Sequence, residues 1–172
     1  MVLVLAQYLA ALFIFSPKRS LSYVFYDYEL FLIVLASVCV VASGYIINNF
    51  YDVKADRINR PLKTVLDNVV KQQTKLKIYF FLNFLGFVFG FLVSWRAALF
   101  FSVYIFSIWF YSHKLKKRAF IGLVTAAILT ILPFFAVLVH FKNFSKIIFV
   151  HASFLFFVVL LRQLIKDLEN IR

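Results

Sequence analysis

A stretch of oxygen-bearing side chains follows directly on an apolar run in the first third of the chain. Asn48, Asp52 and Asp56 are four residues apart, and Asn49 precedes Asp52 by three. Residues three and four apart share a helix face, so a helix through this stretch carries a row of oxygen ligands at its end. Carboxylate and amide oxygens are hard ligands that suit Mg²⁺, which proteins often hold together with substrate phosphates. The stretch therefore predicts a magnesium site for a phosphorylated substrate.

Basic residues accompany these acids. Lys54, Arg57 and Arg60 lie close by and would attract the same phosphates, although the acids could instead simply pair with them. A second acidic helix end contains Asp167 and Asn170, again three residues apart. The chain has only seven acidic residues, and their use at two separate helix ends favours a clamp that holds a metal and a polyanion from two sides.

A third polar segment is strongly basic. It reads Tyr111-Ser112-His113-Lys114-Leu115-Lys116-Lys117-Arg118 and also follows an apolar run. Such a run can act purely as a topology signal, and Arg162, near the second acidic segment, can simply extend to the membrane interface. We assign no role to His113.

The composition tells us what must position these segments. The chain of 172 residues is 64% hydrophobic, with a mean hydropathy of +0.92 and a formal net charge of +12. Soluble domains are about half apolar, so much of this surface must face something other than water. The bases interrupt apolar runs instead of forming a stripe on a polar domain, which argues for membrane lipid or an anionic substrate and against nucleic acid.

Six apolar runs have lengths and compositions that predict membrane helices, and they lack the strict alternation of a membrane β-barrel. The predicted class is all-α, a multi-spanning transmembrane helix bundle. The runs cover about residues 1–15, 30–47, 78–95, 97–111, 120–141 and 147–165.

The loops of this bundle differ in charge. Those after the second and fourth runs and the tail after the sixth are rich in Lys and Arg, whereas the intervening loops are poorer. The positive-inside rule makes the rich side cytoplasmic. All three polar segments fall on that side, so we expect a multi-pass protein of the bacterial inner membrane with its site facing the cytoplasm.

The polar segments resemble a known family. The stretch Asn48-Asn49-Phe50-Tyr51-Asp52, followed by Asp56-Arg57-Ile58-Asn59-Arg60-Pro61, is similar to the first motif, NDxxDxxxDxxxxRP, of UbiA-type intramembrane prenyltransferases. Tyr111-Ser112 followed by Leu115-Lys116-Lys117 resembles their YSxxLKR loop. Residues 162–170 resemble the start of their second acidic motif. The resemblance covers essentially the whole chain.

This resemblance implies an Mg²⁺-dependent membrane prenyltransferase of isoprenoid biosynthesis. It would move an isoprenyl group from an isoprenyl diphosphate to a lipid-soluble aromatic or alcohol acceptor, inside an apolar bundle that keeps water from the carbocation. The implied metal ligands are Asn48, Asn49, Asp52, Asp56 and Asp167. The implied catalytic residues are Asp52, Asp56, Asp167 and Tyr111, the last stabilising the cation or a phosphate oxygen. The implied diphosphate-binding residues are Arg57, Arg60, Lys116, Lys117 and Arg162.

Two departures from the family pattern stand out. Asn49 occupies a position where the family usually has aspartate, which removes one negative charge from the metal site and predicts weaker Mg²⁺ binding. The chain stops at Arg172, where the pattern expects Gly-Asp. We therefore expect residues 1–172 to be one UbiA-like domain truncated at both ends, with about six helices of a nine-helix fold, and this fragment to be inactive.

The acceptor cannot be identified from the residues. Hydroxybenzoate, dihydroxynaphthoate, a haem, a chlorin alcohol partner and a glycerol phosphate ether are all open, although residues 44–48 and 166–169 resemble bacterial relatives of geranylgeranylglycerol-phosphate geranylgeranyltransferases. Two other classes stay open. They are a non-catalytic lipid-binding fragment and a transporter, which would need its polar residues near the bilayer midplane.

Overall fold

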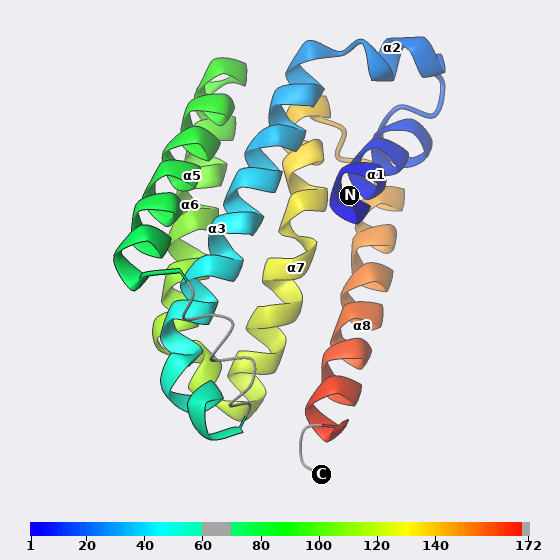
Figure 1. The fold of residues 1–172 in the computed structure, drawn as a ribbon. Helices are drawn as coiled ribbons and strands as arrows, with labels where there is room; N and C mark the ends of the chain where they lie inside the picture. The colour runs from blue at the N-terminus through cyan, green and yellow to red at the C-terminus, as the bar shows by residue number, and fades with distance from the viewer. Residues whose placement is uncertain (60–69, 170–172) are drawn as a thin grey trace.

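The computed structural model describes residues 1–59 and 70–169, and the side chains of residues 54–59, 119, 167 and 169 lie outside that description. Every regular element in this part of the chain is helical, as the hydropathy pattern predicts (Figure 1). The elements are α1 (Val2–Ala10) with the π-helical turn η1 (Ala11–Phe15), α2 (Leu21–Phe25), α3 (Tyr28–Asn59), α5 (Gln72–Val93), α6 (Trp95–His113), the 3₁₀ turn η2 (Leu115–Lys117), α7 (Ala119–Phe141) and α8 (Lys146–Glu169).

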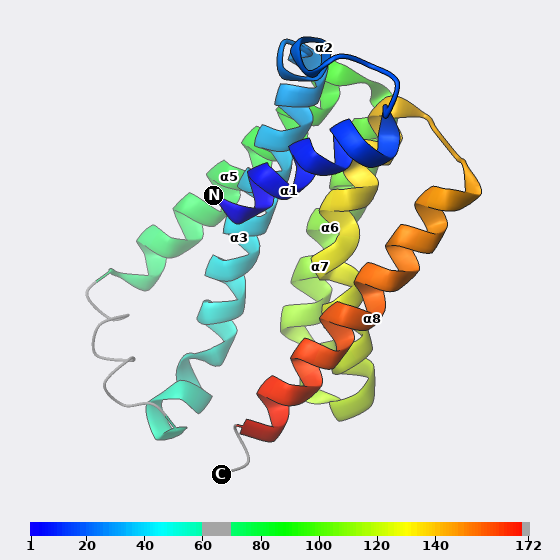
Figure 2. The ribbon, with the colours of Figure 1, turned by 90° about the vertical axis from the view of Figure 1, so that its right-hand side faces the viewer.

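The long helices run up and down the bundle, so their polar ends alternate in position. Figures 1 and 2 show that α3, α6 and α8 all finish at the lower end of the molecule, where α7 begins, while α5 begins above that end. We call this the motif end, defined by Asn59, His113 and Glu169. The opposite end contains α2, the turn between α5 and α6 and the connection from α7 to α8. All three motif segments therefore meet at one end of the bundle.

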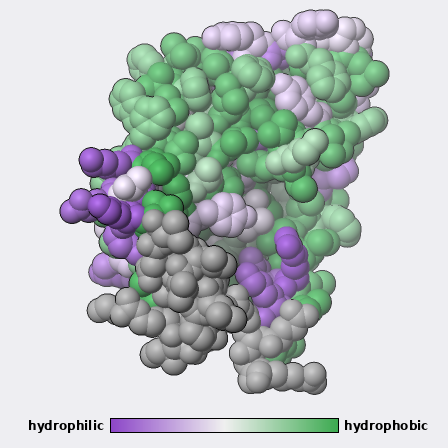
Figure 3. Space-filling model, in the orientation of Figure 1, coloured by the Kyte–Doolittle hydropathy of each residue, from purple (hydrophilic) through white to green (hydrophobic). Residues whose placement is uncertain are grey.

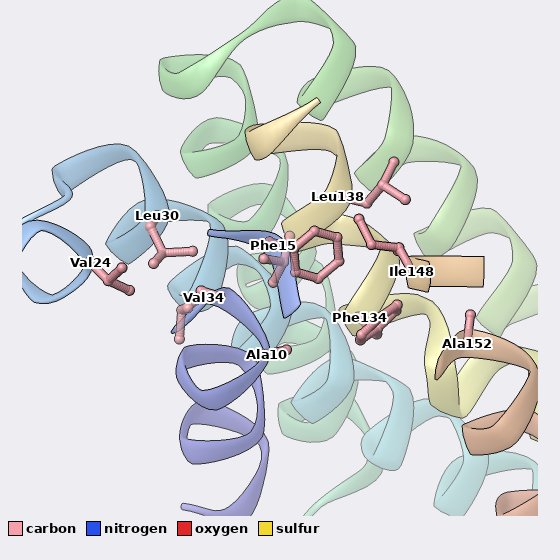
Figure 4. Packing of buried hydrophobic residues seen from close by; sticks show 11 residues of the cluster. Ala10, Phe15, Val24, Leu30, Val34, Phe134, Leu138, Ile148 and Ala152 are labelled. Carbon is pink, nitrogen blue, oxygen red and sulfur yellow. The ribbon is translucent and has the colours of Figure 1, made fainter. Parts of the chain in front are cut away.

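Two buried clusters hold the bundle together, and α3 and α7 contribute to both. One joins α1, α2 and α8 to them through residues such as Phe15, Leu30, Phe134 and Ile148 (Figure 4). The other joins α5 and α6 to them and includes the fully buried Phe101. Because α3 packs in both clusters, the helix that carries the first acidic motif is fixed on both sides.

Within residues 1–59 and 70–169, four helices are long and apolar enough to cross a membrane. They are Tyr28–Val53, Gln72–Val93, Phe120–Phe141 and Lys146–Lys166. The other two predicted spans also form helices. However, α6 is diluted by polar residues, and the segment Val2–Phe15 is short and runs obliquely across the bundle (Figure 2). Figure 3 shows hydrophobic side chains over most of one face and strongly hydrophilic ones toward the motif end.

Local chemistry explains how the helices approach and end. A Cβ added at Gly86 of α5 would lie 2.7 Å from a methyl carbon of Val40, so glycine permits the close approach of α3 and α5. Ser94 separates α5 from α6, and its hydroxyl accepts a hydrogen bond from the Ala97 amide at 3.2 Å, which caps the new helix. The two helices therefore reverse direction within one residue.

Candidate functional site

The motif end brings together oxygen and nitrogen groups from distant parts of the chain. The Lys116 ammonium of η2 donates to Asn48 Oδ1 of α3 at 3.0 Å and forms an ion pair with Asp52 Oδ2. An ammonium is only a donor, so both acceptor groups must direct an oxygen at it. Asn48 and Asp52 are one helical turn apart, as their spacing predicts, and their oxygens converge on one cationic centre.

The position of Lys116 depends on how η2 sits against the neighbouring helices. A Cβ added at Gly122, in the first turns of α7, would lie 2.9 Å from the Leu115 carbonyl oxygen and 3.2 Å from that of Lys116. Glycine at this position lets η2 pack closely on α7. The end of α6 is held against α3 in a similar way, because a Cβ at Gly44 would lie 3.1 Å from the Ile108 side chain.

Asn49 faces a different partner from its neighbour Asn48. Its Oδ1 accepts a hydrogen bond from the ammonium of the half-buried Lys75 of α5 at 3.1 Å. A second lysine therefore reaches the polar end of α3. Sequence reasoning counted Lys75 only among the bases that set topology, because its distance of 26 residues from Asn49 gives no local signal.

Aromatic rings of α3 and α6 pack against each other at the motif end. The ring of Tyr51 is 5.4 Å from the His113 ring, which in turn stacks on Trp109 at 5.5 Å with an angle of 4° between the planes. We assigned no role to His113 from the sequence, and the structure places its ring in contact with both Tyr51 and Trp109. Tyr111 is half-buried in the same last turns of α6.

The other predicted site residues are placed less completely. Asp56 and Arg57 lie in the last turns of α3 and Asp167 in the last turn of α8, but their side chains lie outside the description, as does all of Arg60. Lys117 is exposed on η2, next to Lys116. Arg162 is exposed on α8, and no hydrogen bond or ion pair between described residues joins it to Asn48 or Asp52.

The donors at this site fit a hard divalent cation that is shared with a phosphorylated substrate. Among the described side chains, no group of three or more His, Cys, Asp and Glu gathers in a way that would hold a metal alone. Asn48 and Asp52 supply one amide and one carboxylate oxygen toward one point, and Mg²⁺ is commonly held by one or two carboxylates plus substrate phosphates. Asp52 pairs with Lys116 of the basic segment, whereas the side chains of Lys54, Arg57 and Arg60, the bases with which the acids could instead pair, lie outside the described residues.

A separate polar cluster lies at the opposite end of the bundle. His140 Nε2 is 2.9 Å from Asp27 Oδ2, and its Nδ1 is 3.5 Å from Glu29 Oε2. These residues line an open hollow of about 520 Å³ together with Arg19. Both imidazole nitrogens are directed at carboxylates. We therefore interpret this cluster as a structural contact between the start of α3 and the end of α7, and not as the candidate functional site.

The fold and the motif end define a class of protein, an integral membrane helical bundle with an oxygen-rich, basic site at one end. Comparison with known proteins makes this specific. The model of the UbiA prenyltransferase family matches residues 4–172, and the chain belongs to this family. The family predicted from the three motifs is therefore confirmed.

Individual relatives share one name. The chain is 32% identical to digeranylgeranylglyceryl phosphate synthase of Methanosphaera stadtmanae over 149 residues, which are 85% of this chain and 53% of that protein. It is 25% identical to the protein of the same name from Sulfurisphaera tokodaii over 147 residues, 84% of this chain and 52% of that protein. The chain thus spans about half the length of the curated relatives it matches. No solved structure matches it significantly.

Proposed function

We propose that the protein containing this chain transfers an isoprenyl group from an isoprenyl diphosphate to the hydroxyl group of a lipid acceptor. The observation that carries the proposal is the convergence of Asn48, Asp52 and Lys116 at the end of a membrane helix, in a chain of the UbiA family. An anion-binding lysine beside hard oxygen ligands suits a magnesium diphosphate.

In the proposed reaction the allylic carbon–oxygen bond breaks, and diphosphate leaves with both bonding electrons. The acceptor hydroxyl oxygen then bonds to the allylic carbon, and its proton passes to water or a nearby base. Bound Mg²⁺ would neutralise the charge that grows on the departing diphosphate. Asn48 and Asp52 would hold that ion, with Asn49, Asp56 and Asp167 as further proposed ligands.

Basic and aromatic residues would bind the diphosphate and stabilise the carbocation. Lys116, Lys117, Arg57, Arg60 and Arg162 would bind the diphosphate oxygens, and fixed charges of this kind are effective because they need no reorganisation during the reaction. Tyr111 would stabilise the cation or a phosphate oxygen. The apolar bundle would house the isoprenyl tail and keep water from the cation.

For the acceptor we propose a glycerol phosphate ether that already carries one geranylgeranyl group. The support is the name of the relatives, which denotes the synthesis of a glyceryl phosphate with two such groups. We further propose that the motif end faces the cytoplasm, because the described bases concentrate there. The relatives reported above are archaeal, so they lend no support to a bacterial membrane, which stays a prediction.

The test is a transfer assay in membranes that contain the protein. With labelled geranylgeranyl diphosphate, Mg²⁺ and geranylgeranylglyceryl phosphate, we expect the label in a lipid phosphate, and none when EDTA replaces Mg²⁺. Hydroxybenzoate and dihydroxynaphthoate serve as aromatic acceptors in parallel. Transfer to these alone would overturn the proposed acceptor, and no Mg²⁺-dependent transfer to any acceptor would overturn the proposed activity.

A further inference from the structure

Lys116 occupies the point at which the oxygens of Asn48 and Asp52 converge. Its ammonium makes two of its three possible hydrogen bonds with these groups, from a turn that lies 68 and 64 residues away in the chain. A metal ion bound between the same two oxygens would take the position of the ammonium, and two cations so close together repel each other. The lysine and the metal therefore cannot both be held there.

We infer that Lys116 fills the cation position of the Asn48–Asp52 pair whenever no metal is bound, so that metal and diphosphate each bind more tightly in the presence of the other. This inference rests on the proposed function. Metal alone must displace the ammonium without offering it a new partner. Metal that arrives with diphosphate supplies phosphate oxygens, to which the ammonium can move.

The structure of the pair suits such an exchange. The side chains of Lys116 and Asp52 are 34% and 27% exposed, and exposed ion pairs favour their paired geometry by no more than about fivefold. The lysine side chain is a flexible four-carbon chain, so its ammonium can move without a change in the backbone. Coupling of this kind is reciprocal, so diphosphate should tighten metal binding by the same factor by which metal tightens diphosphate binding.

The first test measures binding of Mn²⁺, as a spectroscopic substitute for Mg²⁺, to the purified full chain without diphosphate. Loss of the EPR signal of free Mn²⁺ reports binding. We expect Lys116→Met to bind Mn²⁺ about two- to fivefold more tightly than Lys114→Met. The latter removes an equal charge from an exposed position in the same loop, so it controls for general electrostatics.

The second test uses the unaltered protein and so does not depend on how a variant folds. A water-soluble amine-acylating reagent is applied, and the modified fraction of each lysine is read by mass spectrometry. Mg²⁺ alone, at millimolar concentration, should raise modification of Lys116 but not of Lys114. Adding a non-reactive thiolo analogue of geranylgeranyl diphosphate with Mg²⁺ should protect Lys116 again.

The outcomes separate this inference from the proposed function on which it rests. If Asp52→Ala abolishes Mn²⁺ binding but Lys116→Met binds no more tightly than Lys114→Met, the metal site stands and the inference fails. Unchanged modification of Lys116 on addition of Mg²⁺ would overturn it in the same way. If Asp52→Ala binds Mn²⁺ as well as the unaltered protein, the proposed metal site fails and the inference fails with it.

Discussion

At the scale of single residues, Asp52 is the most informative position of the candidate site. It supplies the carboxylate in the group of Asn48, Asp52 and Lys116. We expect Asp52→Ala to lower isoprenyl transfer by about a hundredfold or more, because it removes both a hard ligand and the partner of Lys116. Product formation from labelled geranylgeranyl diphosphate is the measurement. Glu29→Ala, at the other end of the same helix, is the control, and equal losses in both variants would contradict a local role for Asp52.

Asn49 offers a second test at this scale, and the structure changes what we expect of it. Asn49→Asp restores the carboxylate of the family motif, which on sequence grounds should tighten Mg²⁺ binding. Lys75 already donates to Asn49 Oδ1, however, so a carboxylate there would pair with Lys75 first. We expect Asn49→Asp alone to increase Mn²⁺ affinity only slightly. When Lys75→Met is added, we expect about tenfold tighter Mn²⁺ binding, because the new carboxylate then has no competing lysine and can ligate the metal.

The control for this pair is Lys75→Met alone, which should leave Mn²⁺ affinity nearly unchanged. A full gain in the single Asn49→Asp variant would show that Lys75 does not compete for the carboxylate, and our account of this contact would then be wrong.

The sequence predicted the residues of this site better than it predicted their partners. The spacing of Asn48 and Asp52 identified a shared helix face because helical periodicity is a local property. The contacts of Lys116 and Lys75 with α3 join positions far apart in the chain, and nothing in either segment alone specifies them. The stacking of His113 on Trp109 escaped notice although it is local, because we gave that histidine no role.

At the scale of elements, the packing of η2 against α7 determines the position of Lys116. Gly122→Ala would place a Cβ 2.9 Å from a backbone oxygen, which cannot move without shifting the turn. Alanine favours a helix by up to about 1 kcal/mol over glycine, whereas overpacking costs about 1–3 kcal/mol. We therefore expect net destabilisation of up to about 2 kcal/mol, together with increased acylation of Lys116.

Gly44→Ala is the matched control, since its Cβ would meet only the side chain of Ile108 at 3.1 Å, and a side chain can adjust. Thermal unfolding in detergent compares the two variants. Equal effects on stability, with no change in Lys116 acylation, would show that η2 does not depend on the glycine.

Hydropathy located α6, α7 and α8 closely, whereas α3 continues to Asn59 and α5 begins at Gln72, both in polar sequence outside the predicted apolar runs. The hydrogen bonds that compensate for local defects inside the bundle were not predictable in this way. Pro133 lies within α7, and its missing N–H cannot bond to the Leu129 carbonyl one turn earlier. The Tyr104 hydroxyl of α6 donates to that carbonyl at 3.1 Å instead. The sequence shows the proline and the helix hydrogen bond that it removes, but the side chain that bonds to the free carbonyl comes from another helix.

At the scale of the whole molecule, the orientation of the bundle is open to a direct test. Single cysteines at Lys114 and Lys18, in a background with Cys39→Ala, mark the motif end and the opposite end. We expect a membrane-impermeant thiol reagent to label Lys114→Cys only from the cytoplasmic side and Lys18→Cys only from the other, because the described bases concentrate at the motif end. Labelling of both from the same side would contradict the arrangement.

The class of the molecule was the most predictable feature, since apolar content and loop charge are properties of whole segments. The helix bundle, the membrane class and the family all followed from the sequence. Hydropathy was least reliable for α6 and for Val2–Phe15. Polar residues such as Arg96, Ser102 and Ser107 dilute the apolar sequence of α6, and Val2–Phe15 is shorter than the other apolar helices of the described chain.

That oblique segment has a consequence for how the protein is made. The buried Gln7 donates to Ser37 Oγ of α3 at 2.9 Å and to the Pro133 carbonyl of α7 at 2.8 Å. Pro133 lies 126 residues further along the chain, so its carbonyl is not yet available when Gln7 enters the membrane, and a bare amide is costly in hydrocarbon. Translation therefore makes this segment early, but it reaches its final place only after α7 has entered the membrane.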